Sequence, residues 1–384
     1  MKHLDDVWAE MADFRHDLHR TPEIAGQEFK TMRMIRNRLA KLDLEVLPPF
    51  LETDTVAILH GAKPGGNLTF RADIDALKIE EKTGCPYASE TPGMMHACGH
   101  DAHTAMLMGA AEILCSMKDE LKGTIRFVWQ PGEENEAMAK ELIAAGALDS
   151  PAPDMVAAIH MAPGIPVGMM KVCRGASEAA CTHFKITFRG KGGHGSLPHA
   201  SRSALTAAAF AVVEAQSIVP NRLSPHHAGV ISICCFNSGT LHNIIPEEAV
   251  LQGTIRSFDT EDDEMLADAL REVCEGAAKI HRVNCEVDLV HGYLPVINTP
   301  VETEMAIRAA KRAGLEVGTP RYPSMGSEDF SFFLTKAPGV MIKLGNGENA
   351  PGLHQPDFDA SDEAMRYGIR YLVELAKDFS ATRA

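Results

Sequence analysis

The stretch Gly123-Thr-Ile-Arg-Phe-Val-Trp-Gln-Pro-Gly-Glu-Glu134 decides the fold, because it joins an apolar strand to a turn and a pair of acids. Residues 123–129 are rich in β-branched and aromatic side chains, which is typical of a strand, and Pro131-Gly132 closes it. Glu133 and Glu134 therefore lie at the carboxyl end of this strand. Because adjacent side chains of extended backbone point to opposite sides, we expect one carboxylate to bind metal and the other to face water and substrate.

Strands and helices alternate on both sides of this stretch. Helix 136–145 follows it directly. Other strands are expected at 55–59, 67–71, 155–159 and 339–344, and other helices at 4–18, 28–42, 104–117, 301–313 and 362–379. This alternation predicts an α/β domain with a mixed, mostly parallel sheet.

Residues 177–290 follow a different order. A strand at 182–189, a helix at 203–218, strands at 229–236 and 248–258, a helix at 261–281 and a strand at 284–290 are expected. The order βαββαβ is the ferredoxin-like pattern. The sequence therefore predicts a discontinuous domain of residues 1–176 and 291–384, interrupted by an inserted α+β domain of residues 177–290.

Potential metal ligands follow several of the expected strands. His96-Ala-Cys98-Gly-His100-Asp-Ala-His103 contains imidazole, thiolate and carboxylate groups, the donors that zinc and manganese use. His160 ends one strand, Asp73 and Asp75 end another, and His354 follows the strand at 339–344. Because ligands of open α/β sheets bind beyond the carboxyl ends of the strands, we expect these side chains to meet at one edge.

The inserted segment contains Gly190-Lys-Gly-Gly-His194-Gly195, which has the spacing of a dinucleotide-binding turn. Such a turn requires a helix that opens at the third glycine, and Pro198 stands in the way. A dinucleotide-dependent oxidoreductase is therefore a disfavoured alternative.

Composition narrows the class of partner. The formal charge of −15 argues against nucleic acid and anionic membranes. The first 20 residues carry many charges, and no apolar run approaches the roughly 20 residues of a spanning helix. Nine cysteines in 384 residues do not indicate a disulfide framework. We therefore expect a cytoplasmic protein with reduced thiols.

Beyond these patterns, the chain resembles the amidohydrolase branch of the two-metal aminoacylase and carboxypeptidase superfamily, which includes hippurate hydrolase and N-acyl-L-amino-acid amidohydrolase. The resemblance extends over nearly the whole chain. It rests on an ordered series of motifs: Arg15-His-Asp-Leu-His19, Arg71-Ala-Asp-Ile-Asp75-Ala-Leu77, His96 to His103, Gln130 to Glu134, His160, Gly192-Gly-His-Gly195, Asn243-Ile-Ile-Pro246, Gly253-Thr-Ile-Arg256, Gly326-Ser-Glu-Asp-Phe330 and Leu353-His354.

The resemblance implies a zinc-peptidase-like catalytic domain that holds two divalent metal ions (manganese, zinc, nickel or cobalt). The implied ligands are Cys98 as the bridging ligand, His100, Glu134, His160 and His354. Glu133 would be the general base. The inserted domain would serve as a dimerisation or lid domain, and its His194 would reach the active site of the partner subunit. Asn243 and Arg256 would bind substrate.

The function expected from this resemblance is hydrolysis of the amide bond of a small-molecule N-acyl amino acid, hippurate-like or N-acetylated, by a homodimer or higher homo-oligomer. A dipeptidase or carboxypeptidase of the same superfamily is an alternative, which the Cys98 pattern disfavours. A non-catalytic binding module is a further alternative. Glu133 beside Glu134 speaks against it, because a binder needs no general base.

Overall fold

Two units, each with its own sheet, make up residues 4–134 and 137–382, which the computed structural model describes. The first unit contains the chain up to Ser177, Ile297–Pro323 and the chain from Asp329 onward. The second contains Glu178–Val296 and Ser324–Glu328. It extends beyond the expected limit at residue 290 because its last strand continues to Tyr293.

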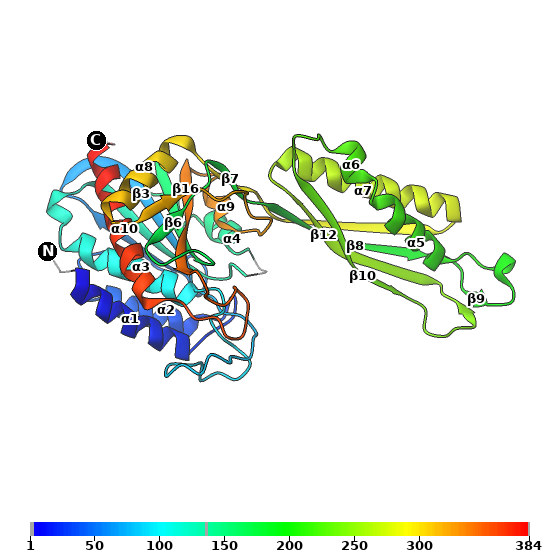
Figure 1. The fold of residues 1–384 in the computed structure, drawn as a ribbon, viewed down its shortest axis with the longest axis horizontal. Coiled ribbons are helices and arrows are strands. Elements are labelled where there is room, and N and C mark those ends of the chain that lie inside the picture. Colours follow the sequence, from blue (N-terminus) through cyan, green and yellow to red (C-terminus); the bar gives the residue numbers. More distant parts are fainter. Residues whose placement is uncertain (1–3, 135–136, 383–384) are drawn as a thin grey trace. The chain divides into compact units, whose positions relative to one another are not determined.

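An eight-stranded sheet forms the centre of the first unit (Figure 1). Its strand order is β1-β2-β4-β3-β5-β16-β6-β15. The four strands β4, β3, β5 and β16 run parallel, whereas β1, β2 and β6 introduce antiparallel pairs. The strands are β1 (Glu45–Val46), β2 (Thr55–His60), β3 (Lys63–Asp73), β4 (Lys122–Gln130), β5 (Met155–Pro163), β6 (Met169–Lys171), β15 (Glu316–Gly318) and β16 (Gly339–Gly347). The predicted mixed, mostly parallel sheet is thus confirmed.

The middle strands are buried on both faces. Residues 155–161 of β5 and 125–130 of β4 are all buried, as expected for parallel strands covered by helices. The helices are α1 (Leu4–Arg20), α2 (Phe29–Leu39), α3 (His100–Cys115), α4 (Ala139–Ala144), α8 (Pro300–Arg312), α9 (Phe330–Phe333) and α10 (Asp362–Thr382), with a 3₁₀ turn η1 (Lys118–Glu120). Helix α3 packs against α1, α10 and β3, and its residues 100–114 are all buried.

The second unit contains a four-stranded antiparallel sheet of order β10-β12-β8-β13 (green to yellow in Figure 1). Helices α5 and α7 pack against this sheet, and together they form an apolar core. This order confirms the ferredoxin-like pattern. The elements are β8 (Ala180–Arg189), β9 (Gly193–His194), η2 (Pro198–Ala200), α5 (Ala204–Ala215), α6 (Ile218–Arg222), β10 (Gly229–Ser238), β11 (Ile244–Ile245), β12 (Glu248–Ser257), α7 (Thr260–His281) and β13 (Asn284–Tyr293). The strands β7 (Gly175–Glu178) and β14 (Val296–Asn298) form a separate pair.

Three local expectations need correction. The helix expected after His103 begins at His100, which places that imidazole in the first turn of α3. The helix expected over 203–218 is divided into α5 and α6, because Pro220 has no N–H for a continuous helix. Residues 193–194 form strand β9, and the next α-helix begins only at Ala204, so the described residues contain no dinucleotide-binding turn there.

None of the helices within the described ranges has the length and apolar character needed to cross a bilayer.

Candidate metal centre

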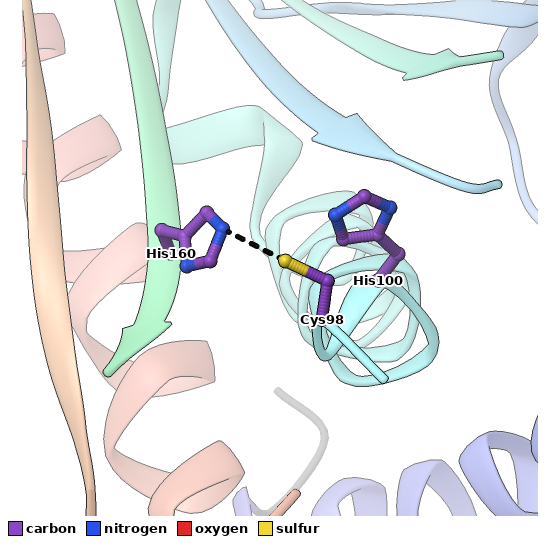
Figure 2. A group of neighbouring side chains, drawn as sticks. All are labelled: Cys98, His100 and His160. Carbon is purple, nitrogen blue, oxygen red and sulfur yellow. Dashed lines mark hydrogen bonds between the residues drawn. The ribbon is translucent and has the colours of Figure 1, made fainter. Parts of the chain in front are cut away.

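Three metal-ligating side chains meet at the carboxyl end of the first unit's sheet. Cys98 precedes α3, His100 begins it, and His160 lies on β5. Figure 2 shows Cys98 between the two imidazole rings, with its Sγ 3.5 Å from His160 Nε2. One ligating atom from each residue lies within 4.8 Å of the others, and all three residues are buried.

Contacts of Nδ1 fix the direction in which Nε2 of each of these two histidines points. In His160, Nδ1 donates to the Met161 carbonyl at 2.7 Å. In His100, Nδ1 faces the Asp75 carbonyl oxygen at 2.9 Å and the Asp75 carboxylate at 3.1 Å. Such partners fix the orientation of metal-binding imidazoles. Nε2 of His100 is buried without a hydrogen-bond partner among the residues that the structure describes, which suits a bound cation.

A second group of donors shares Cys98 with the first. It consists of Cys98, Glu134 and His354, whose ligating atoms also lie within 4.8 Å of one another. His354 Nε2 is 2.9 Å from Glu134 Oε1, and its backbone N–H donates to the Ala97 carbonyl at 2.8 Å. The Glu134 backbone N–H donates to Asp75 at 2.9 Å. Asp75 therefore supports ligands of both groups.

Glu133 lies beside both groups. Its carboxylate forms a further cluster with His100 and Glu134, and only 6 % of the residue is exposed. The structure thus brings Cys98, His100, Glu133, Glu134, His160 and His354 to one edge of the sheet.

The donor set fits two divalent cations that share a thiolate. On one tetrahedral zinc ion, bonds of about 2.3 Å to sulfur and about 2.05 Å to nitrogen place the two ligands about 3.6 Å apart. The observed Cys98–His160 distance is 3.5 Å. Glu134 Oε1 and His354 Nε2 are 2.9 Å apart. They would separate slightly on binding a common cation, because an oxygen and a nitrogen ligand of one tetrahedral zinc ion are about 3.4 Å apart.

Burial and charge set the protonation of these groups. Burial raises the pKa of the Cys98 thiol to about 12, and a bound cation favours the thiolate. Burial also lowers the pKa of His160 well below its usual value. Burial alone would lower the pKa of His100, but the charge of Asp73 raises it well above the usual value. The hydrogen bond to Glu134 raises the pKa of His354.

Other residues of the His96–His103 motif face different partners. His103 Nδ1 lies 2.6 Å from Asp73, and its Nε2 accepts a 2.8 Å hydrogen bond from the Met161 N–H. Both ring nitrogens are therefore engaged. Asp101 lies 2.8 Å from His19 Nδ1 and 3.4 Å from the Arg15 guanidinium. These two motif residues support the fold around the centre.

Sequence reasoning placed Asp73 and Asp75 at this edge but assigned them no role. Asp73 forms ion pairs with Arg71 and His103, both at 2.6 Å. Burial would raise the pKa of Asp73, but the charges of His100, His103 and Arg71 hold it well below its usual range. The Asp-x-Asp spacing at the end of a strand was the available signal for supporting carboxylates.

His194, Asn243 and Arg256 belong to the second unit. His194, in β9, is exposed, and its Nδ1 accepts hydrogen bonds from Ser196. Asn243 lies beside it, since its carbonyl accepts the Gly195 N–H at 2.8 Å. Arg256, on β12, donates instead to the Met325 carbonyl at 2.8 Å. The structure therefore brings His194 and Asn243 together within this unit and gives Arg256 a different set of contacts.

Sequence relatives cover almost all of the chain. It is 37% identical over 369 residues to N-acetylcysteine deacetylase of Bacillus subtilis, covering 95% of this chain and 96% of the relative. It is 35% identical to N-acetyldiaminopimelate deacetylase of Streptococcus uberis, with coverages of 95% and 98%. It is also 35% identical to thermostable carboxypeptidase 1 of Saccharolobus solfataricus, with coverages of 95% and 94%.

Solved structures show the same fold, and a family model covers most of the chain. A putative aminohydrolase from methicillin-resistant Staphylococcus aureus superposes with a TM-score of 0.92 at 30% identity, covering 98% of both chains. A dinuclear metal-binding peptidase of the M20 family from Bacillus subtilis gives 0.87 at 32% identity, covering 98% of this chain and 99% of the other. The model of peptidase family M20/M25/M40 matches residues 69–378. The chain therefore belongs to peptidase family M20/M25/M40 and is a metal-dependent hydrolase of amide bonds.

Proposed function

We propose that the chain hydrolyses N-acyl amino acids, with an N-acetyl or a hippurate-like N-aroyl group. The observation that carries this proposal is the arrangement of Cys98, which is common to two groups of metal donors, beside the buried carboxylate of Glu133. The names of two relatives, which act on N-acetylcysteine and N-acetyldiaminopimelate, support the substrate class.

In this proposal, Cys98, His100, Glu134, His160 and His354 hold two divalent cations. Zinc, manganese, nickel and cobalt all accept thiolate, imidazole and carboxylate ligands. When bound, the cations would polarise the substrate carbonyl and increase the acidity of a water molecule. Cys98 would contact both cations, because it alone among these five residues belongs to both ligand groups.

Glu133 would carry the proton during the reaction. It would accept the proton of the attacking water at its carboxylate and then transfer that proton to the leaving amine nitrogen. Its carboxylate lies close to ligating atoms of His100 and Glu134, which supports a position beside the proposed cations. Its low exposure keeps bulk water from competing for the same proton.

A pocket beside Glu134 offers space for part of the substrate. It measures about 350 Å³, and Ile24, Leu77 and Ile79 form apolar walls. Small-molecule sites are commonly of this size and character. This wall composition suits an acyl chain or an apolar side chain.

The second unit would form the dimer and complete the site. Ser196 donates to Nδ1 of His194, which leaves Nε2–H available to stabilise the developing oxyanion. In this proposal, His194 does so in the active site of the partner subunit, and Asn243 and Arg256 bind the substrate. Exposed apolar side chains on this unit, including Leu197, Leu241 and Ile244, support a protein interface.

A carboxypeptidase activity is a second candidate, supported by the name of the Saccharolobus solfataricus relative. Both reactions cleave an amide bond next to an amino-acid residue. A hydrolysis screen with N-acetyl amino acids, N-benzoyl amino acids and dipeptides, repeated with each metal, separates the two candidates.

Adjacent carboxylates provide the decisive test of the proposed mechanism. We expect E133Q to lose at least about 100-fold in turnover while it keeps its bound metal, because only the proton carrier is removed. The matched variant E134Q should lose metal as well as activity. Metal content by plasma mass spectrometry and initial rates distinguish the two. Near-normal turnover in E133Q would refute the role of Glu133.

The shared site is tested by mixing subunits. H194A should lose turnover and keep its metal. Confirmed mixed dimers of H194A and E133Q should recover part of the activity, because one of their two sites combines an intact Glu133 with an intact partner His194. No recovery in such dimers would rule out sharing of the site.

A further inference from the structure

A further group of metal-ligating atoms lies in the first unit, outside the ligand set described above. His19 is near the end of α1, whereas Glu81 and Cys85 lie in the loop between β3 and α3. Their ligating atoms all lie within 4.8 Å of one another. His19 is fully buried, and the other two residues are partly exposed. The group therefore combines a fixed imidazole and a largely buried carboxylate side chain with a partly exposed thiol.

The separations within the group match those around one tetrahedral ion. His19 Nε2 is 3.4 Å from Glu81 Oε1, and Cys85 Sγ is 3.8 Å from the same oxygen. Ligands of one zinc ion would be about 3.4 Å apart for nitrogen and oxygen and about 3.6 Å apart for sulfur and oxygen. The first distance is long for a hydrogen bond between charged groups, which is usually about 2.7–2.9 Å.

Surrounding contacts hold the side chains of His19 and Glu81 in place. The buried Asp101 engages Nδ1 of His19 at 2.8 Å, so that Nε2 faces Glu81. This is the carboxylate–histidine arrangement common behind metal-binding imidazoles. The Ser89 N–H donates to Oε2 of Glu81 at 2.6 Å, whereas Oε1 accepts the Thr83 hydroxyl and also faces His19 Nε2 and Cys85 Sγ. The Thr83 hydroxyl lies 3.3 Å from Cys85 Sγ.

We propose that His19, Glu81 and Cys85 form a zinc site distinct in its ligands from the two-metal centre. Imidazole and thiolate select zinc over magnesium or calcium, which prefer oxygen ligands. With three protein ligands, a water molecule takes the fourth position. Binding displaces a proton from His19 Nε2 and from the Cys85 thiol, so the affinity decreases as the pH falls.

Zinc counting on the whole chain tests this site. The wild-type protein, C85S and C115S are stripped with chelator, reloaded with Zn²⁺, desalted and measured by plasma mass spectrometry. C115S is the control, since Cys115 is also partly exposed, packs against the apolar core and has its thiol directed at the Asp43 carbonyl. We expect C85S to bind one zinc ion fewer per chain than the wild type and C115S to bind the same number. Equal zinc content in C85S and the wild type would overturn the site.

Alkylation of the wild-type chain gives an independent measurement. Zn²⁺ should slow the reaction of Cys85 with iodoacetamide, read by peptide mass spectrometry, and leave Cys115 unchanged. Unaltered alkylation of Cys85 at saturating zinc would equally overturn the site. Because both readouts follow Cys85 itself, they do not depend on the proposed two-metal mechanism, whose failure would appear in E133Q and E134Q instead.

Discussion

Removal of the Asp329 carboxylate should destabilise the first unit strongly. The buried Arg71 guanidinium donates to Asp73 and to Asp329, both at 2.6 Å, and to Gln130 at 2.8 Å. The second oxygen of Asp329 accepts from the Gln130 amide at 2.6 Å and from the Ala139 N–H at 3.0 Å. Asp329 thus connects β3, β4 and the start of α4.

The magnitude follows from burial. Arg71 is 3 % exposed and Asp329 is 0 % exposed, so D329A leaves a buried positive charge with one carboxylate partner fewer. Breaking such a pair costs about 3–5 kcal/mol of unfolding free energy. D329N keeps one acceptor oxygen for Arg71 and should cost less, about 1–3 kcal/mol.

Urea unfolding followed by tryptophan fluorescence measures this loss. Both tryptophans, Trp8 and Trp129, belong to the first unit, so the signal reports on the unit that contains Asp329. D43A is the control, because Asp43 pairs with Lys118 on the exposed surface and such pairs contribute little. We expect no measurable change in the control. A loss below about 1 kcal/mol in D329A would refute the assigned role of this buried pair.

Two further changes test the backbone and the pH dependence. G99A should lower the free energy of unfolding, measured by thermal denaturation, by about 1–3 kcal/mol, because Gly99 has φ +86° and an added Cβ would lie 3.2 Å from Met161. The control G26A, at a glycine with φ +73° where an added Cβ would meet no atom within 4 Å, should lose less stability. Equal losses in the two variants would exclude crowding at Gly99. Burial raises the pKa of Glu28 from 4.5 to about 7. Because the folded protein binds this proton more tightly than the unfolded chain, the contribution of Glu28 to the free energy of unfolding is fully present below pH 4.5. That contribution is lost as the pH rises to about 7, and the loss is up to about 3 kcal/mol. E28Q should lack this decline in urea unfolding at pH 5 and pH 8, and identical profiles would contradict the prediction.

The sequence by itself determined the fold class and indicated which potential metal ligands lie together at the edge of the sheet. Helical and strand periodicities are local properties, and they identified the parallel strands and the βαββαβ segment. Because parallel strands end at the same edge of a sheet, donors that follow different strands were expected to meet there. The structure brings Cys98, Glu134 and His160 together at that edge.

Only the tertiary structure decided which way each side chain points and which distant partners it meets. His100 and His103 belong to one motif, yet Nε2 of His100 faces the metal centre, whereas both nitrogens of His103 are engaged elsewhere. Asp329 pairs with Arg71 across 258 positions, and Glu81 approaches His19 across 62. Such contacts depend on the packing of whole elements, because neither spacing nor periodicity within a short segment carries the direction of a side chain or the identity of a remote neighbour.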